Sequence, residues 1–297
     1  MASDRVVVTL GTATPGGGFP LYGQAVTETI NAADASLELR PQNTKGSIEN
    51  VPLLDAGKID LGLVTGEVVY EALGGIGRPK ADLRVLAAMY SSPGMFVLRA
   101  DSPARTIEDL KGKPVIFGAK GSGLVVLARY VLDGLGLDLE RDFKAIYLDR
   151  AGDGPKMVLE GEAAALWGGG IGWPGFKAVA ESAGGARFIV PDAAGIRRIL
   201  AKHTFLRPLT VPANAYPGQS EPIASLGSWS FIVARPGLDE SVAYRLAKAL
   251  HRGEAQLAQR LAQARETTAV NTIAAATAGQ LHPGVLRYFR EAGLVKP

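Results

Sequence analysis

The sequence predicts an α/β protein built of two lobes, and three observations predict this class. The chain has 297 residues, which is enough for two lobes of ordinary domain size. Short apolar runs alternate along it with stretches of helical periodicity, which is typical of strands and helices in alternation. A glycine-rich loop joins a predicted strand to a predicted helix in each half of the chain, within residues 10–22 and 118–123.

In the first part of the chain, the first strand is nearly all apolar, as in a sheet buried on both faces. Ser47 is suited to be the N-cap of a helix that ends before Gly57. The pattern predicts strands over residues 5–10, 37–42, 59–64, 83–90 and 95–99, and helices over 20–33, 47–57 and 68–73. Ser91 to Gly94 are expected to separate the last two strands, and the passage to the second lobe is expected near residues 100–103.

In the second part, Thr106 is expected to cap a one-turn helix that Gly112 ends. Ser122 is expected near the N-cap of the following helix, and His282, which precedes Pro283, is suited to cap the last helix. Residues 204–222 are rich in proline and are interpreted as an irregular return toward the first lobe. The remaining pattern predicts strands over 114–117, 143–148, 163–167, 186–190 and 228–234, and helices over 124–135, 155–160, 174–183, 195–203, 239–266 and 281–293.

Composition excludes several classes of function. Hydrophobic residues make up 47% of the chain and charged residues 21%, which is a globular balance. The net charge of +3 is not gathered into a basic block with aromatics, so no nucleic-acid partner is expected. There is no cysteine, and the three histidines, His203, His251 and His282, are widely spaced. We therefore expect no metal and no cofactor.

The chain also lacks the marks of a membrane span or an enzyme. No apolar run reaches the roughly 20 residues that cross a bilayer, so no direct membrane insertion is expected. No Ser/His/Asp order or pair of catalytic carboxylates stands out, and we name no catalytic residue.

The glycine-rich loops carry the chemistry that the sequence suggests. A loop that ends in a helix N-terminus presents unpaired backbone N–H groups, and the helix dipole favours an anion there. Thr65 to Glu67 also follow a predicted strand and begin a helix, at the strand edge where α/β proteins bind ligands. These features predict capture of a small anionic organic solute, whereas a plain tight turn is the alternative for each loop.

Several segments together resemble the TAXI branch of the solute-binding proteins that serve TRAP transporters. They occur in the order of the family and cover nearly the whole chain. The segments are Leu10-Gly11-Thr12 through Gly16-Gly17-Gly18-Phe19-Pro20-Leu21; Gly46-Ser47-Ile48-Glu49-Asn50 with Leu54, Gly57 and Asp60; Asp109-Leu110-Lys111-Gly112 with Gly121-Ser122-Gly123; Ala213 to Gln219; and His282-Pro283-Gly284-Val285-Leu286-Arg287-Tyr288.

The resemblance implies a periplasmic-binding-protein fold of type II, the Venus flytrap, in which each lobe is a mixed sheet flanked by helices. We place lobe I at residues 1–100 plus 224–297 and lobe II at 101–223, with the ligand cleft between them. The resemblance further implies a periplasmic protein whose export signal is absent from this sequence. It implies a monomer that delivers a small carboxylate, such as an amino acid, keto acid or dicarboxylate, to TRAP membrane permease subunits.

Candidate ligand-binding residues follow from the loops and the resemblance. They are Thr14, Gly16, Gly17, Phe19, Tyr22, Ser47, Asn50, Glu67, Tyr90, Ser91, Gly121, Ser122, Gly123, Trp167, Gly168, Gly169 and Tyr216. Each has a structural alternative: a turn for the glycines, a helix cap for Ser47 and Asn50, a surface helix start for Glu67, and core packing for Trp167. Tyr90 and Ser91 are alternatively hinge residues.

Three departures from the pattern of the resembled family bear on the ligand. Leu124 stands where relatives carry threonine, which removes a hydroxyl that could bond the ligand. Residues 163–165 are all alanine where an aspartate is frequent. Glu67 replaces an uncharged polar residue, and its carboxylate disfavours a nearby ligand carboxylate unless an ammonium or basic group pairs with it.

Other functions remain as alternatives. A ligand-sensing receptor module that reports solute to a signalling partner fits the same fold. An enzyme on that fold, of the porphobilinogen-deaminase kind, needs a cysteine that this chain lacks. A regulator of the LysR type carries a DNA-binding helix-turn-helix, and no basic helical segment precedes residue 5.

Overall fold

The computed structural model describes residues 5–296. The chain divides into two compact units: unit 1 comprises residues 1–13, 19–90 and 229–297, and unit 2 comprises residues 14–18 and 91–228. The expected lobe boundaries were near residues 100 and 224, whereas the units change over inside strands at residues 90/91 and 228/229, and also at both ends of residues 14–18. Residues 1–4 and 297 of the expected lobe I lie outside the described residues.

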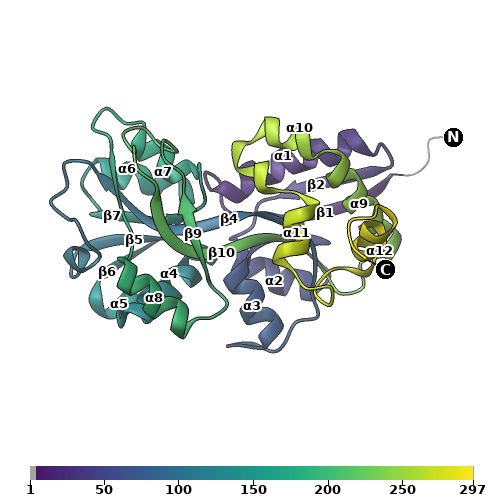
Figure 1. The fold of residues 1–297 in the computed structure, drawn as a ribbon, viewed down its shortest axis with the longest axis horizontal. Helices are drawn as coiled ribbons and strands as arrows, with labels where there is room; N and C mark the ends of the chain where they lie inside the picture. Colours follow the sequence, from purple (N-terminus) through teal and green to yellow (C-terminus); the bar gives the residue numbers. More distant parts are fainter. Residues whose placement is uncertain (1–4, 297) are drawn as a thin grey trace. The chain divides into compact units, whose positions relative to one another are not determined.

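Unit 1 is a sheet with helices on both sides (Figure 1). Strands β2, β1, β3 and β10 follow one another in the sheet, with β1 parallel to β2 and β3, and β10 antiparallel to β3. Helices α1 and α10 lie on one side, and α2 and α3 on the other. The elements are β1 (Val6–Gly11), α1 (Gly18–Ala33), β2 (Leu37–Gln42), α2 (Ser47–Asp55), β3 (Leu61–Thr65), α3 (Gly66–Gly74), α9 (Glu240–Arg252), α10 (Glu254–Arg260), the 3-10 helix η3 (Ala262–Glu266), α11 (Ala269–Ala275) and α12 (Pro283–Glu291).

Two strands belong to both units, β4 (Arg84–Arg99) and β10 (Ile223–Ala234). The expected break at Ser91 to Gly94 was wrong, because β4 is one continuous strand that is buried from Val85 to Leu98. Close packing of β10 explains this: a Cβ on Gly227 would lie 2.0 Å from the Ser92 carbonyl oxygen, and Ser225 Oγ donates to the Gly94 carbonyl at 2.6 Å. A tertiary neighbour thus overrides the local turn signal.

Unit 2 is a second sheet with helices on both sides. Strands β4, β7, β5 and β6 are neighbours in that order, β8 pairs with β4, and β9 pairs with β10. Figure 1 shows α6 and α7 on one side of this sheet and α4, α5 and α8 on the other. The elements are η1 (Glu108–Leu110), β5 (Pro114–Ala119), α4 (Gly123–Leu135), α5 (Leu139–Asp142), β6 (Lys144–Leu148), η2 (Ala151–Asp153), α6 (Gly154–Leu159), β7 (Ala165–Gly169), α7 (Pro174–Ala180), β8 (Ala186–Ile189), α8 (Ala193–Lys202) and β9 (Arg207–Val211).

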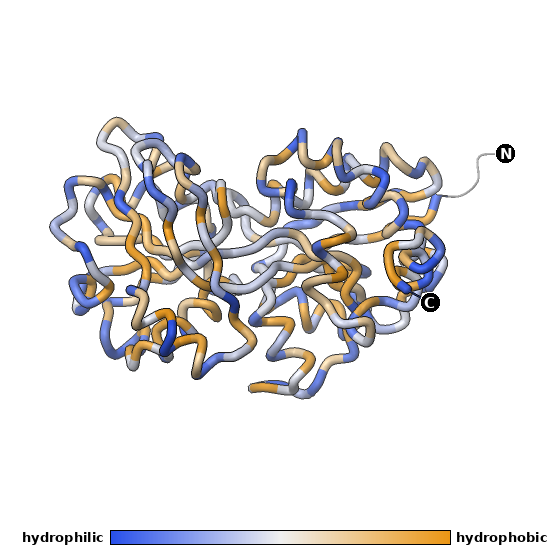
Figure 2. The backbone as a smooth tube through the Cα atoms, viewed as in Figure 1, coloured by the Kyte–Doolittle hydropathy of each residue, from blue (hydrophilic) through white to orange (hydrophobic). Residues whose placement is uncertain are grey.

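Each side of the unit 2 sheet has its own apolar core. Phe96, Phe117 and Leu127 belong to the core on the α4 side, and Ile116 and Phe176 to the core on the α7 side. Figure 2 shows hydrophobic and hydrophilic residues alternating along these helices, which is the amphipathic pattern of helices that cover a sheet. Strands and helices alternate along both units, which confirms the expected pattern.

The remaining differences from the predicted elements have local causes. The proline-rich return contains β9, an outer strand on which Pro208 is tolerated because it needs no ladder N–H. The helix expected over residues 239–266 is divided at Gly253, where a Cβ would lie 2.4 Å from Thr29 Cγ2 of α1. Only glycine lets α1 approach this closely, and the chain breaks its helix there. Helices α5 and α11 were not predicted.

Candidate functional site

The first glycine-rich loop is fixed by its own hydrogen bonds within unit 2, to which Thr14–Gly18 belong. The Ala151 N–H donates to Thr14 Oγ1 at 3.1 Å, and the Gly152 N–H donates to the Pro15 carbonyl at 3.3 Å. Gly16 has a φ of +82°, and a Cβ there would lie 2.5 Å from Gly152 Cα, so this position requires glycine. A hydroxyl can accept one hydrogen bond and donate another, so the Thr14 O–H can still donate to a further acceptor.

The loop leads into α1, where Phe19 is partly exposed and Tyr22 is fully buried. The Tyr22 hydroxyl lies 3.1 Å from Thr267 Oγ1, and its ring packs edge-on against Tyr90 with centroids 5.6 Å apart. Burial raises the pKa of Tyr22 well above its ordinary value. Tyr22 therefore fixes the start of α1 to the segment that follows η3.

Ser47 and Asn50 join the carboxyl ends of two parallel strands. The expectation that Ser47 caps α2 was wrong: Gly46 is the N-cap, and Ser47 Oγ accepts from the Thr65 N–H at 3.1 Å. The Asn50 side-chain amide donates to the carbonyls of Gly11, Thr12 and Leu63, at 3.3, 2.9 and 2.8 Å. Both side chains are fully buried. Their bonds hold β1 and β3 at the edge where α/β sheets bind ligands.

Helix α3 begins at this edge, directly after β3. Its N-cap is Thr65, whose side chain makes no capping hydrogen bond. Thr65 Oγ1 is buried and has no hydrogen-bond partner in residues 5–296. Glu67 lies in the first turn of α3 and is 1% exposed, where the helix dipole favours a negative charge. The edge therefore combines a buried hydroxyl, first-turn N–H groups and a buried carboxyl group.

Tyr90 and Ser91 are consecutive residues of β4, and the chain passes from unit 1 to unit 2 between them. Both are buried. Burial, with smaller contributions from Tyr22 and Glu266, raises the pKa of Tyr90 far above its ordinary value, so its hydroxyl is protonated and able to donate. The chain therefore crosses between the two units at Tyr90 and Ser91, which is where a hinge residue has to lie.

The second glycine-rich loop follows β5 in unit 2. Ser122 is the N-cap of α4, and its Oγ accepts from the Leu124 N–H at 3.1 Å, which confirms the predicted cap. Gly121 and Ser122 are partly exposed, whereas Gly123 is buried. The loop thus presents a helix N-terminus with a hydroxyl whose proton is available to donate.

Trp167 lies in the core of unit 2, as its structural alternative supposed. It is completely buried, stacks near Phe96 with centroids 4.8 Å apart, and donates its indole N–H to the Leu124 carbonyl at 2.9 Å. The next residue, Gly168, leaves room for Trp173, whose ring would lie 2.5 Å from a Cβ. Gly169 is packed against Leu124. This segment supports the second glycine-rich loop by packing.

Tyr216 fastens another glycine-rich turn in unit 2. Its hydroxyl accepts from the Gly172 N–H at 2.9 Å and lies 3.3 Å from the Gly170 carbonyl oxygen, to which it donates. Burial raises the pKa of Tyr216 to about 12, so the hydroxyl stays protonated at neutral pH and can donate to the Gly170 carbonyl. The side chain is 3% exposed and packs against Phe188 with centroids 4.8 Å apart.

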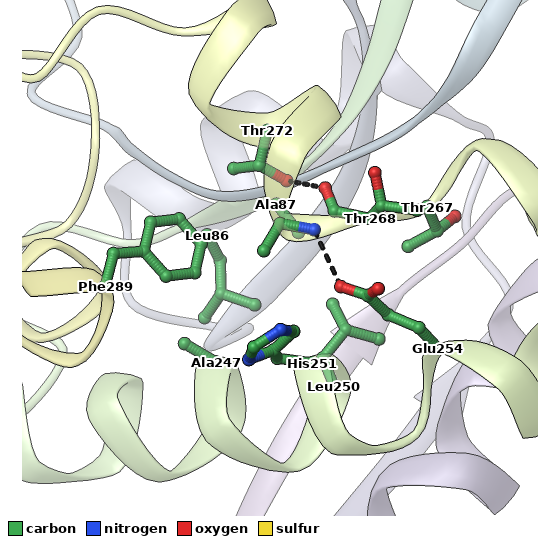
Figure 3. A pocket seen from close by; sticks show the side chains of 11 residues that line it. Leu86, Ala87, Ala247, Leu250, His251, Glu254, Thr267, Thr268, Thr272 and Phe289 are labelled. Atoms are coloured by element: carbon green, nitrogen blue, oxygen red, sulfur yellow. Dashed lines mark hydrogen bonds between the residues drawn. The ribbon is translucent and has the colours of Figure 1, made fainter. Parts of the chain in front are cut away.

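Two cavities within unit 1 are separate from the candidate residues. One measures about 10 Å³, room for about one water molecule, and is bordered by Leu250, His251, Glu254 and Thr268 (Figure 3). In it Glu254 accepts from the Ala269 N–H at 2.7 Å. The other, about 250 Å³, lies beside the end of α1 and is bordered by Arg252 and Arg260. No candidate residue lines either one.

Membrane-spanning helices and metal-binding clusters are both absent from the described residues. Within residues 5–296 no helix has the length and apolar character needed to cross a membrane. The same residues hold no group of three or more His, Cys, Asp or Glu side chains arranged for a metal ion.

Of the buried polar residues that were not among the sequence-predicted candidates, Thr12, Thr65 and Gln263 bear most on the site. Thr12 Oγ1 donates to the Gln42 carbonyl at 3.0 Å, next to the Asn50 network. Thr65 ends β3 immediately before α3, and this strand-to-helix position was a signal that could have identified it. Gln263 lies in η3 with both side-chain amide atoms buried and without a hydrogen-bond partner in residues 5–296. Nothing in the sequence distinguishes Gln263 from the other glutamines of the C-terminal helices.

Solved structures define the class of fold. The chain is similar to MatC from Rhodopseudomonas palustris with bound malate, at 15% identity and a TM-score of 0.58, over 99% of this chain and 97% of that one. It is similar to the substrate-binding protein of an amino acid ABC transporter, at 13% identity and 0.53, over 87% and 99%. It is also similar to a TctC solute-binding protein from Polaromonas, at 17% identity and 0.50, over 90% and 91%.

These likenesses confirm the predicted fold, which is that of the two-lobed periplasmic solute-binding proteins. A model of the NMT1-like family matches residues 10–293, which is nearly the entire chain. The chain therefore belongs to the NMT1-like family.

Proposed function

We propose that the protein is a periplasmic solute-binding protein that captures a small carboxylate for a membrane transporter. One observation carries the proposal: in each unit a helix N-terminus follows a buried strand, α3 directly after β3, and α4 after β5 and the short loop of residues 120–122. Such termini bind anionic groups through first-turn N–H groups and the helix dipole. The family and the fold support this reading.

The proposed contacts are hydroxyl groups and backbone N–H groups beside helix N-termini. In unit 1 they are Thr65 and the first turn of α3. In unit 2 they are Ser122 at the start of α4 and Thr14 in the loop before α1, with the glycines beside each. Five candidates act in this proposal by holding the contacting segments, because each makes a side-chain hydrogen bond to another residue of the chain: Ser47, Asn50, Tyr22, Trp167 and Tyr216. Of their polar atoms, Asn50 Oδ1 is buried without a hydrogen-bond partner in residues 5–296.

Glu67 bears on how the solute carboxylate is placed. A buried carboxylate near a bound carboxylate is unfavourable unless a positive charge lies between them. An amino acid brings such a charge in its ammonium group, and amino acids, keto acids and dicarboxylates all belong to the proposed solute class. Delivery to TRAP permease subunits, membership of the TAXI branch, export, and a monomeric state belong to the same proposal.

A thermal-shift screen tests the proposal. The panel contains L-glutamate, L-alanine, 2-oxoglutarate, malate and succinate, with glucose and putrescine as neutral and cationic controls. A ligand at 100 times its dissociation constant stabilises the folded state by about 2.7 kcal/mol, which such a screen detects. The proposal expects at least one acid to stabilise the protein. Stabilisation by glucose or putrescine alone contradicts it.

Thr65→Val then tests the site, because it removes the hydroxyl and keeps the side-chain shape. Loss of a hydrogen bond to a charged solute costs about 1.5–3 kcal/mol of binding. Thr210→Val is the matched control, since Thr210 is exposed on β9. Equal affinity of the two variants for the stabilising acid refutes the placement of the site at the end of β3.

A further inference from the structure

We propose that Gln263, in η3 of unit 1, is a specificity-determining contact for the solute. Its amide would pair with the group next to the solute carboxylate and discriminate an amino or hydroxy group from a keto group there. The inference rests on the proposed function and goes beyond it, because Gln263 lies outside both glycine-rich loops and outside every strand end.

The first observation is an amide without internal partners. Gln263 is 6% exposed, and neither Nε2 nor Oε1 has a hydrogen-bond partner in residues 5–296. Burial of an amide removes its hydrogen bonds to water, so native proteins satisfy nearly all such groups. A buried glutamine that bonds to nothing in its own chain is costly to stability. It is therefore expected to have a partner from outside the chain.

The second observation is where η3 lies. Thr267 follows η3, lies 3.1 Å from the Tyr22 hydroxyl, and donates to the Met89 carbonyl at 2.6 Å. These bonds fasten the end of η3 to the start of α1 and to β4, one residue before Tyr90. The segment that carries Gln263 thus packs beside two of the candidate residues, Tyr22 and Tyr90.

Burial places Gln263 in the interior of unit 1. Gln263 is 6% exposed, and Thr267 at the end of η3, which bonds Tyr22 and Met89, is 1% exposed. This segment therefore turns buried polar groups toward unit 1 and not toward solvent.

The chemistry of an amide defines what it can recognise. Gln263 offers a donor, Nε2, and an acceptor, Oε1, side by side and without charge. A carboxylate oxygen can take the donor, but only a solute group with its own hydrogen can bond the acceptor. An ammonium or hydroxy group beside the carboxylate donates to Oε1 while a carboxylate oxygen accepts from Nε2, so both atoms are satisfied. A keto group leaves Oε1 unpaired, and a site whose polar group loses its partner rejects that analogue strongly.

The test uses two matched sets of acids: L-alanine, L-lactate and pyruvate, and L-glutamate, L-2-hydroxyglutarate and 2-oxoglutarate. Titration calorimetry gives the affinity of each for the wild type, for Gln263→Met, and for Gln256→Met. The last is the control, because Gln256 is an exposed glutamine of the neighbouring α10. In the wild type, the amino or hydroxy acid of one set is expected to bind roughly tenfold or more tightly than its keto acid.

In Gln263→Met, this preference is expected to fall to about threefold or less, while Gln256→Met keeps it. A second readout excludes a purely structural role. Without solute, Gln263→Met is expected to melt at or above the wild-type temperature, because an apolar side chain replaces an amide without internal partners. If the Gln263 amide instead has a structural role and is bridged by buried water, Gln263→Met is expected to melt below the wild-type temperature.

The outcomes separate the two claims. If the wild type binds acids with a preference that Gln263→Met retains, the role of Gln263 is refuted and the proposed function stands. A melting temperature of Gln263→Met below that of the wild type, with unchanged affinities, also refutes it. If the wild type binds none of the six acids, the role of Gln263 is refuted, and the proposed function fails as well only if no acid of the thermal-shift panel, malate and succinate included, stabilises the protein.

Discussion

Asn50 provides the sharpest test of how unit 1 is built. Its amide donates to three backbone carbonyls from two strands, and the side chain is completely buried. Asn50→Ala removes all three bonds. Each hydrogen bond contributes about 0.5–1.5 kcal/mol net, and a buried acceptor left unpaired costs about 1–3 kcal/mol. The Thr12 carbonyl keeps the Thr44 hydroxyl as a second donor, at 3.1 Å. We therefore expect a loss of about 2–4 kcal/mol in the free energy of unfolding.

The assay is urea unfolding with linear extrapolation to water. Asn50→Asp is the stricter variant, since it keeps the shape and turns a donor into an acceptor opposite three carbonyls. We expect it to lose at least as much stability as Asn50→Ala. Gln24→Ala is the control, because Gln24 is exposed on α1 and bonds only Glu28. If Asn50→Asp unfolds at the same urea concentration as Gln24→Ala, the network does not hold the two strands together.

Two further predictions concern stability elsewhere in the chain. Ser122→Ala removes the N-cap of α4 and is expected to lower the free energy of unfolding in urea by about 1 kcal/mol. Ser122→Asp keeps a capping acceptor and is expected to recover most of this stability, and no recovery would contradict the capping role of Ser122. At Asp60, burial acts to raise the carboxyl pKa, but bonds from Thr9 and Arg235 outweigh it and hold that pKa below the ordinary value of 3.8. Stability from Asp60 is therefore fully present above about pH 4 and is lost as the pH falls through the lowered pKa. Asp60→Asn is expected to be less stable than the wild type at pH 7 and to match it near pH 2, measured by thermal melts; a gap that persists at pH 2 contradicts this linkage.

Features with local causes could be predicted from the sequence. A hydroxyl before an apolar helical run identified the cap at Ser122, and a histidine before Pro283 identified the cap at His282, whose side chain accepts from the Gly284 N–H. Glycine-rich loops between strands and helices were recognisable for the same reason. Helix and strand order follows from periodicity, which is a property of short segments.

Features that depend on distant neighbours could not be predicted. Ser47 has the sequence of an N-cap, yet its partner is the Thr65 N–H, 18 residues away. Ser91 to Gly94 have the composition of a turn, yet β10 packs against them and keeps β4 extended. The importance of Gln263 rests on burial without an internal partner, which only a folded structure reveals.

The central claim, that this chain binds one small carboxylate, is tested most directly by titration calorimetry with the acid that stabilises the protein most. We expect saturable heat with one solute bound per chain, and an affinity that Thr65→Val weakens by about tenfold or more while Thr210→Val leaves it unchanged. Saturable heat that Thr65→Val leaves unchanged would place the site elsewhere. No saturable heat with any acid of the panel would contradict carboxylate binding by this chain.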